Sequence, residues 1–155
     1  KNHKSSNGIQ TNGTLISEEL LKFIGDVKDF GIGLSIDGPK ELNDLTRKFP
    51  NGKGSYEEIE KKIKILKEYE TSFGSICVVN KNNIKFPNEL YSFFADKKIN
   101  VKFNPLIKSG KAEENFEDLG ISPKEYSKFI SELFDIYNED SLKFGETRIN
   151  IDPIL

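Results

Sequence analysis

The sequence alternates short apolar runs with longer amphipathic ones, and this alternation limits the fold more than any other feature. Short apolar runs are typical of buried strands, whereas the longer ones repeat apolar residues at helical spacing. We predict strands at Gly8 to Thr11, Gly31 to Ile36, Phe73 to Val79, Val101 to Leu106 and Arg148 to Ile151. We predict helices at Ser17 to Asp29, Ser55 to Tyr69, Asn83 to Lys97 and Ser122 to Tyr137. This order favours parallel strands joined by right-handed crossovers.

Two of the helix starts carry a capping box. Ser55 with Glu58, and Ser122 with Glu125, have the required spacing. In such a box the serine hydroxyl accepts from the amide three residues on, while the glutamate reaches back to the serine amide. Both serines are therefore predicted to cap their helices.

The remaining local signals concern loops and burial. Pro39 to Gly54 is predicted as a polar loop, and a second, acidic loop is predicted from the fourth strand to Gly120. Pro87 is expected in the first turn of its helix, where a missing amide costs little. The nearly continuous apolar run Phe73 to Val79 predicts a strand buried on both faces.

The chain is expected to form a single α/β domain over residues 1–155. Alternating strands and helices fit either an open doubly wound sheet or part of a barrel. The chain stops at Leu155, just after a predicted strand, which suggests that the native protein continues.

Composition bears on several classes of protein. The 23 basic and 25 acidic side chains give a net charge of −2, which indicates no nucleic-acid surface. No apolar run approaches the ~20 residues of a membrane helix. The single cysteine, Cys77, excludes an internal disulfide or an all-cysteine metal site, so a reducing cytoplasm is expected. His3 is the only histidine, in a polar terminus, and Ser-His-Asp and His/Cys metal sites are not expected.

Polar residues cluster where the predicted strands end. The clusters contain Gln10 to Gly13, Ser35 to Gly38, Asn80, Asn104 and Asp152. The carboxyl ends of parallel strands form one rim, which is where ligands bind in such folds. Asn, Asp and Gly also make ordinary turns and caps, so each cluster by itself has a second interpretation.

Six strings along the chain form an ordered set: IQTNGTLI (Ile9 to Ile16), GLSIDGPKELND (Gly33 to Asp44), TRKFPNGKGSYEEIEKKIKIL (Thr46 to Leu66), SICVVNKNN (Ser75 to Asn83), VKFNPLI (Val101 to Ile107) and SPKEYSKFISELFDIY (Ser122 to Tyr137). In this order they resemble the radical S-adenosylmethionine (SAM) enzymes of the SPASM-containing group, and within it the anaerobic sulfatase-maturating enzymes and related peptide maturases. The ordered set covers nearly the whole chain.

This resemblance implies part of a (β/α)6 partial TIM barrel. The chain would supply its third to sixth strands and the start of the next segment. The CxxxCxxC loop that holds the 4Fe-4S cluster, and a GGEP-like motif, would lie upstream, and a cysteine-rich domain downstream. The parent protein would then use SAM and the cluster to abstract hydrogen from a peptide or protein substrate, and this chain alone would be inactive.

The resemblance also implies roles for individual residues. Ser35 matches the family serine that contacts the amino-acid end of SAM, and Arg47 matches an arginine suited to the SAM carboxylate. A surface salt bridge is the alternative for Arg47. The other candidates for the cofactor-binding rim are Asp37, Thr11, Asn12, Asn80 and, more weakly, Asn104.

Asp152 is the candidate catalytic base. In sulfatase maturases an aspartate in a comparable position takes the proton as the substrate cysteine or serine is oxidised to formylglycine. Asp152 precedes a proline, so a turn is the alternative. The sequence departs from the maturase pattern with Asn43 in place of a common histidine, and with Pro153 in place of glycine.

Two other functions remain open at this point. The first is a non-catalytic partial barrel that binds a partner, and the second is a complete phosphate-binding barrel enzyme, for which no glycine-rich phosphate loop is seen. Exposed barrel edges also predict dimerisation or strand exchange if the fragment folds alone.

Overall fold

A computed structural model describes residues 7–27 and 30–154 of the chain. His3 lies outside the described residues, and so do residues 28–29, the last two of the first predicted helix.

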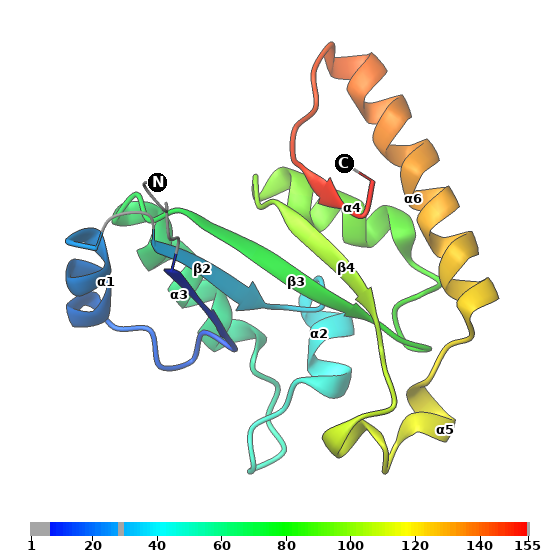
Figure 1. Cartoon of the computed structure of the whole chain (residues 1–155), viewed down its shortest axis with the longest axis horizontal. Coiled ribbons are helices and arrows are strands. Elements are labelled where there is room, and N and C mark those ends of the chain that lie inside the picture. Colours follow the sequence, from blue (N-terminus) through cyan, green and yellow to red (C-terminus); the bar gives the residue numbers. More distant parts are fainter. Residues whose placement is uncertain (1–6, 28–29, 155) are drawn as a thin grey trace, which may run out of the picture.

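The sheet has five strands, which are β1 (Asn7–Thr11), β2 (Phe30–Ser35), β3 (Phe73–Val79), β4 (Val101–Pro105) and β5 (Ile151–Asp152). They lie in the order β1-β2-β3-β4-β5, and every neighbouring pair is parallel. The predicted α/β class and parallel strands are therefore confirmed. The carboxyl ends of β1 to β4 lie toward one edge, called the carboxyl edge below (Figure 1). The short strand β5 ends further back, because Asp152 is the register partner of Lys102, the second residue of β4.

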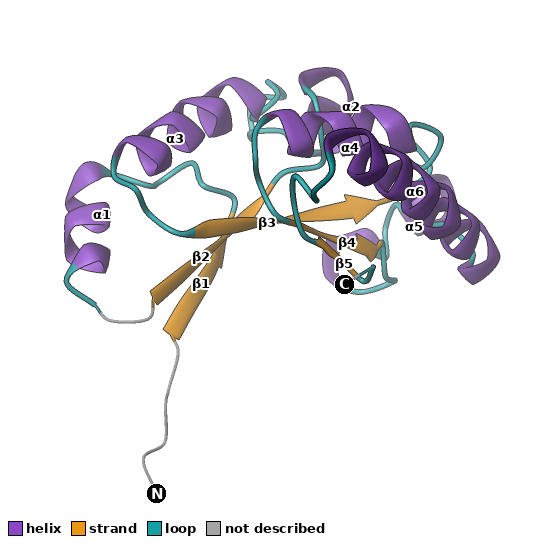
Figure 2. Cartoon of the chain, turned by 90° about the horizontal axis from the view of Figure 1, so that it is seen from above, coloured by secondary structure: helices purple, strands orange, loops and turns teal. Residues whose placement is uncertain are grey.

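Four helices cover one side of this sheet (Figure 2). They are α1 (Glu18–Gly25), α3 (Tyr56–Glu68), α4 (Pro87–Asp96) and α6 (Pro123–Phe144). Each corresponds to a helix predicted from apolar spacing. The bounds of α1, α3 and α4 differ from the prediction by at most four residues, whereas α6 extends seven residues beyond the predicted end at Tyr137. Pro87 begins α4, as predicted.

Both predicted loops contain short helices. The first contains α2 (Lys40–Thr46), and the second contains η1 (Gly110–Ala112) and α5 (Phe116–Leu119). The prediction of a loop at 39–54 was wrong because α2 depends on tertiary hydrogen bonding. Its Asn43 is fully buried and accepts a hydrogen bond from the Asp37 amide at 3.1 Å, a contact that no local pattern reveals.

The two predicted capping boxes have opposite outcomes. At Ser122 the box is complete: Ser122 Oγ accepts from the Glu125 amide at 3.2 Å, and Glu125 Oε2 accepts from the Ser122 amide at 2.7 Å. At Ser55 the prediction was wrong, since its side chain makes no cap bond. The Tyr56 amide donates instead to Asp44 Oδ1 at 2.9 Å, and Ser55 is buried.

The core lies between the sheet and the four helices. Alternate strand residues point into it, and Leu34, Cys77, Phe103 and Ile151 are each at most 1% exposed. The ring of Phe103 makes edge-on contacts with the rings of Phe94 of α4 and Phe129 of α6, with centroid distances of 5.8 Å and 5.6 Å. We call the side of the sheet that packs against these helices the covered face.

The opposite side of the sheet is called the open face. There the prediction that β3 is buried on both faces was wrong, since Ile76 and Val78 remain partly exposed while Ser75, Cys77 and Val79 are buried. The apolar run thus reflects a sheet with helices on one side and partly exposed apolar residues on the other.

Candidate functional site

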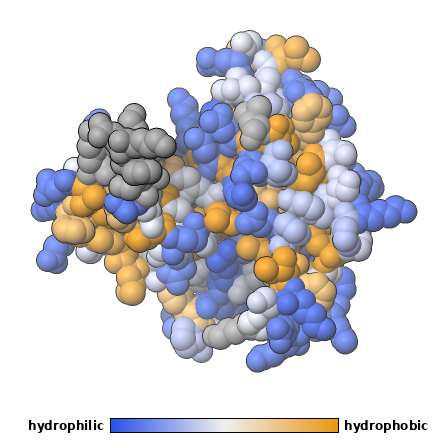
Figure 3. Space-filling model, in the orientation of Figure 1, coloured by the Kyte–Doolittle hydropathy of each residue, from blue (hydrophilic) through white to orange (hydrophobic). Residues whose placement is uncertain are grey.

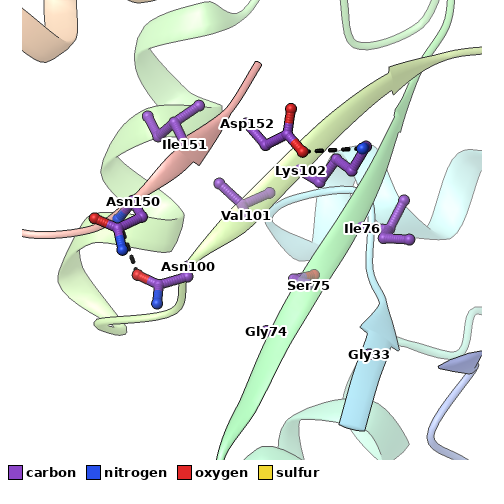
Figure 4. Close-up of a pocket in the computed structure, with 10 residues that line it drawn as sticks. All are labelled: Gly33, Gly74, Ser75, Ile76, Asn100, Val101, Lys102, Asn150, Ile151 and Asp152. Atoms are coloured by element: carbon purple, nitrogen blue, oxygen red, sulfur yellow. Dashed lines mark hydrogen bonds and ion pairs between the residues drawn. The ribbon is translucent and has the colours of Figure 1, made fainter. Parts of the chain in front are cut away.

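The open face carries a shallow hollow near its middle. Its volume is about 310 Å³, and it is lined by residues of β2, β3, β4 and β5 (Figure 4). Gly33 and Gly74 are register partners in this region. The Gln10 side chain lies over Gly33, whereas the space at Gly74 is bordered only by the Asn100 carbonyl oxygen. The missing side chain at Gly74 leaves the sheet backbone accessible to a ligand there.

An ion pair closes one side of the hollow. Lys102 Nζ lies 2.9 Å from Asp152 Oδ2, and the two residues are register partners on β4 and β5. Their side chains are 49% and 50% exposed. Asp152 is the last residue of β5, and it also lies in a turn, because the Ile154 amide donates to the Ile151 carbonyl at 2.8 Å. The turn weighed as the alternative for Asp152 is therefore present. Its side chain points to the open face and does not lie in a buried recess.

Asp37 joins three segments just beyond the end of β2. It is 3% exposed, and its Oδ1 accepts from the Val78 amide of β3 at 2.8 Å and from Arg47 Nη2 at 2.9 Å. The next residue, Gly38, has a φ of +112°, a backbone conformation that residues other than glycine rarely adopt. This glycine lets the chain turn from the strand toward α2.

Arg47 is therefore drawn into the protein. Its Nε lies 2.8 Å from Asp37 Oδ2, although this nitrogen has no hydrogen-bonded acceptor among the described residues. The side chain is 22% exposed. The ion pair weighed as the alternative for Arg47 is present, but its partner is a buried aspartate rather than a surface one. The role toward SAM stays a prediction.

Ser35 lies on the open face and is paired with a residue of the edge strand. Gln10 Nε2 of β1 donates to Ser35 Oγ at 2.9 Å. Ser35 is in register with Ile76, which is in register with Lys102, and Lys102 with Asp152. One row across four strands thus joins the predicted SAM-binding serine to the predicted base.

Three of the four remaining candidates make turns, and the fourth, Asn104, lies half-buried on β4. Thr11 Oγ1 accepts from the Gly13 amide at 3.1 Å, and Asn12 Oδ1 accepts from the Thr14 amide at 3.2 Å. Asn80, which is buried, accepts from the Asn82 amide at 2.9 Å. Thr11 also lies on β1, the opposite edge strand from Asp152. Their proposed contacts with a ligand stay predictions.

Sequence reasoning did not single out Lys102 or Gln10. For Lys102 a signal exists, because Val101 and Phe103 are apolar while Lys102 and Asn104 are polar, which places the last two on the other face. For Gln10 no signal reveals its partner, since Ser35 is 25 positions away.

The described residues do not form a cluster or metal site. Among them, no group of three or more His, Cys, Asp or Glu side chains is placed to hold a metal ion. Cys77 is fully buried in β3, as predicted for a core residue, and burial raises the pKa of its thiol well above the ordinary value. Within 7–27 and 30–154, no helix has the length and apolar character to cross a membrane.

Among known proteins, the chain is similar to several that are named anaerobic sulfatase-maturating enzymes. The chain is 37% identical over 150 residues to a cysteine-type anaerobic sulfatase-maturating enzyme of Clostridium perfringens, covering 96% of the chain and 40% of that protein. It is 32% identical to a serine-type anaerobic sulfatase-maturating enzyme of Bacteroides thetaiotaomicron, covering 89% and 37%. The chain thus spans about 40% of the length of these relatives.

Solved structures agree with this likeness. The structure described as native anSMEcpe with bound AdoMet and Kp18Cys peptide superposes with a TM-score of 0.79 at 34% identity, covering 93% of this chain and 40% of that one. AdoMet is another name for SAM. SuiB of Streptococcus suis matches with a TM-score of 0.65 at 16% identity, which shows a shared fold.

The predicted partial barrel is therefore confirmed at the level of the fold. A family model described as the radical SAM superfamily matches residues 1–94, which is more than half of the chain and includes β1 to β3. The chain belongs to the radical SAM superfamily.

Proposed function

We propose that this chain is the SAM-facing and substrate-facing part of an enzyme that oxidises a residue of a peptide or protein substrate. Its relatives are named sulfatase-maturating enzymes, and a similar solved structure is described with bound AdoMet and a peptide, which supports this proposal. The observation that carries the proposal is the row from Ser35 to Asp152 on the open face of a radical SAM fold. In this superfamily bound SAM and a reduced 4Fe-4S cluster supply hydrogen-abstracting radical chemistry.

The chain's own residues are suited to hold SAM and not the cluster. The proton of the Ser35 hydroxyl is free to meet an acceptor oxygen, because Ser35 donates no hydrogen bond among the described residues. The cluster needs three thiolates, and one buried cysteine cannot provide them. We propose that residues outside these 155 hold the cluster, in a reducing cytoplasm.

Anaerobic reconstitution with iron and sulfide tests this division of labour. The 155-residue chain is expected to take up no stoichiometric cluster and to release no 5′-deoxyadenosine from SAM. A full complement of cluster iron in this chain, with the matching absorption, would contradict the proposal.

Asp152 is proposed as the base that accepts the substrate proton. Its half-exposed carboxylate faces the open side, where a peptide has access. Lys102 competes for the same carboxylate at 2.9 Å, so a bound substrate has to share or displace this partner. A base must lie within hydrogen-bond reach of the proton that it removes, which the open face allows.

The full-length protein, with its cluster, tests the activity. A peptide with a central cysteine, and one with serine, are incubated with SAM and reductant, and 5′-deoxyadenosine and formylglycine are measured. Asp152→Asn is expected to lower formylglycine formation by about 100-fold or more. Glu132→Gln, which removes an exposed ion pair on α6, is the control and should match the wild type.

The outcome also separates the enzyme from a binding module. Peptide binding without any 5′-deoxyadenosine would favour the non-catalytic alternative. Formylglycine formation by Asp152→Asn at the wild-type rate would remove Asp152 from the base role and leave the rest of the proposal standing.

We further propose that the chain self-associates when produced alone. In the described sheet β1 pairs only with β2, and its residues 7–10 are exposed. Apolar residues gather nearby at α1 (Figure 3). Leu15, in the segment before α1, is 89% exposed, and Phe23 of α1 is 64% exposed. An open strand edge beside apolar surface favours edge pairing. Light scattering that shows a monomer at high concentration would contradict this.

A further inference from the structure

Gly33 on β2 is a glycine that the backbone does not require. It is absent from the glycines with positive φ, so its conformation is open to other residues. A methyl group built on Gly33 would overlap Gln10 Oε1, whereas one built on Gly31 meets nothing within 4 Å. Gly33 therefore provides the space in which the Gln10 side chain lies across β2.

From this position Gln10 reaches Ser35. Its Nε2 donates to Ser35 Oγ at 2.9 Å, and Gln10 and Gly33 are register partners. A serine hydroxyl has one proton to donate and two lone pairs. Because Gln10 occupies a lone pair with an N–H group, the Ser35 proton is directed away from Gln10, and the open face is where an acceptor can meet it.

We propose that Gln10, seated over Gly33, is a positioning residue that sets the Ser35 hydroxyl as a hydrogen-bond donor to the carboxylate of SAM. The inference rests on the proposed function and adds to it. It states which of the two charged groups at the amino-acid end of SAM, the carboxylate or the ammonium, Ser35 contacts. The carboxylate accepts hydrogen bonds, whereas the ammonium only donates them.

The test measures the affinity of the full-length protein, with its cluster, for SAM and for decarboxylated SAM by calorimetry. Gln10→Ala is expected to weaken SAM binding about 5- to 10-fold, the usual effect of disturbing one hydrogen bond to a charged group. Gln10→Glu should weaken it more than about 10-fold, since glutamate accepts the Ser35 proton and repels the carboxylate. Neither change should alter the affinity for decarboxylated SAM by more than about 2-fold.

Two glycine variants isolate the positioning effect. Gly33→Ala displaces Gln10 and should reproduce the Gln10→Ala loss, while Gly31→Ala, on the same strand and face, should bind as the wild type does. The double variant Gln10→Ala/Gly33→Ala should bind no worse than either single one, because both act through the same side chain. Thermal unfolding checks that each variant is folded.

The outcomes are distinct. A wild-type protein that carries its cluster and binds no SAM overturns the proposed function, and this inference with it. Wild-type binding with unaffected Gln10→Glu and Gly33→Ala variants overturns the inference alone. Equal losses for SAM and decarboxylated SAM also overturn it, because Gln10 would then support the fold rather than recognition of the carboxylate.

Discussion

The two faces of the sheet are made by alternate residues of the same strands, yet they differ in nearly every physical property. On the covered face Leu34, Cys77 and Phe103 are closed off from solvent by four helices. On the open face their neighbours Ser35, Ile76 and Lys102 remain accessible. A single step along a strand therefore separates a side chain packed in the core from one that solvent reaches. A one-residue shift in register would exchange the two sets.

The largest effect is expected from shortening one apolar side chain on each face. Leu34→Ala on the covered face should lower the free energy of unfolding by about 3–4 kcal/mol, because it leaves a cavity in a filled core. Ile76→Ala on the open face should cost less than about 1.5 kcal/mol, since solvent already reaches this side chain. Urea unfolding compares the two, and equal losses would remove the distinction between the faces.

Asp37 sharpens the comparison at the carboxyl edge, where a buried charge borders the open face. Asp37→Asn should cost about 3 kcal/mol, because it leaves Arg47 without its charge partner in a largely buried place. Asp37→Asn/Arg47→Met should recover part of this loss, as the unpaired charge is gone. No recovery in the double variant would show that the bond from the Val78 amide to Asp37 is the main contribution.

The helix layer behind the covered face contains its own polar link. Asp140 of α6 accepts from Arg148 Nε at 2.8 Å and from the Tyr91 hydroxyl at 2.6 Å. Partial burial opposes the charged form, but the bonds from Arg148 and Tyr91 outweigh it and lower the pKa of Asp140. A lowered pKa adds stability above the unfolded-state value of about 3.9, and this stability is lost as the pH falls through the folded value.

Asp140→Asn should therefore cost about 1.5 kcal/mol at neutral pH and much less in acid. Unfolding by urea at a series of pH values from 7 to below the ordinary aspartate pKa measures the difference. Asp135→Asn, at an exposed position on the same helix, is the control and should cost less than about 0.5 kcal/mol at neutral pH. A constant cost for Asp140→Asn across the series would contradict the assignment.

The smallest effect is expected for the ion pair of the open face. Lys102→Ala should change the free energy of unfolding by less than about 1 kcal/mol, because half-exposed pairs are screened by water and salt. The change should shrink further in high salt, which thermal unfolding with added sodium chloride measures. A large, salt-independent loss would mean that the open face also carries stability.

Much of the fold follows from local patterns. Strands β1 to β4 and the four long helices were predicted because their apolar residues repeat with the period of two or 3.6 that each structure imposes. The fifth predicted strand, Arg148 to Ile151, shares only Ile151 with β5, and residues 148–150 are not in a strand. The cap at Ser122 followed from spacing alone, since both of its bonds lie within four residues. The same reasoning failed at Ser55. There the cap of α3 comes from Asp44, which accepts from the Tyr56 amide although the two residues are twelve positions apart.

The candidate site divides in the same way. The polar residues that follow each apolar run were enough to place Ser35, Asp37 and Asp152 at or just beyond strand ends. That Asp152 lies level with the start of β4 depends on the strand register. Which of these side chains touch was settled only by the tertiary structure. It directs Arg47 to Asp37, Gln10 to Ser35 and Lys102 to Asp152. These partners lie 10, 25 and 50 positions apart, and strand pairing and packing, rather than local periodicity, bring such distant residues together.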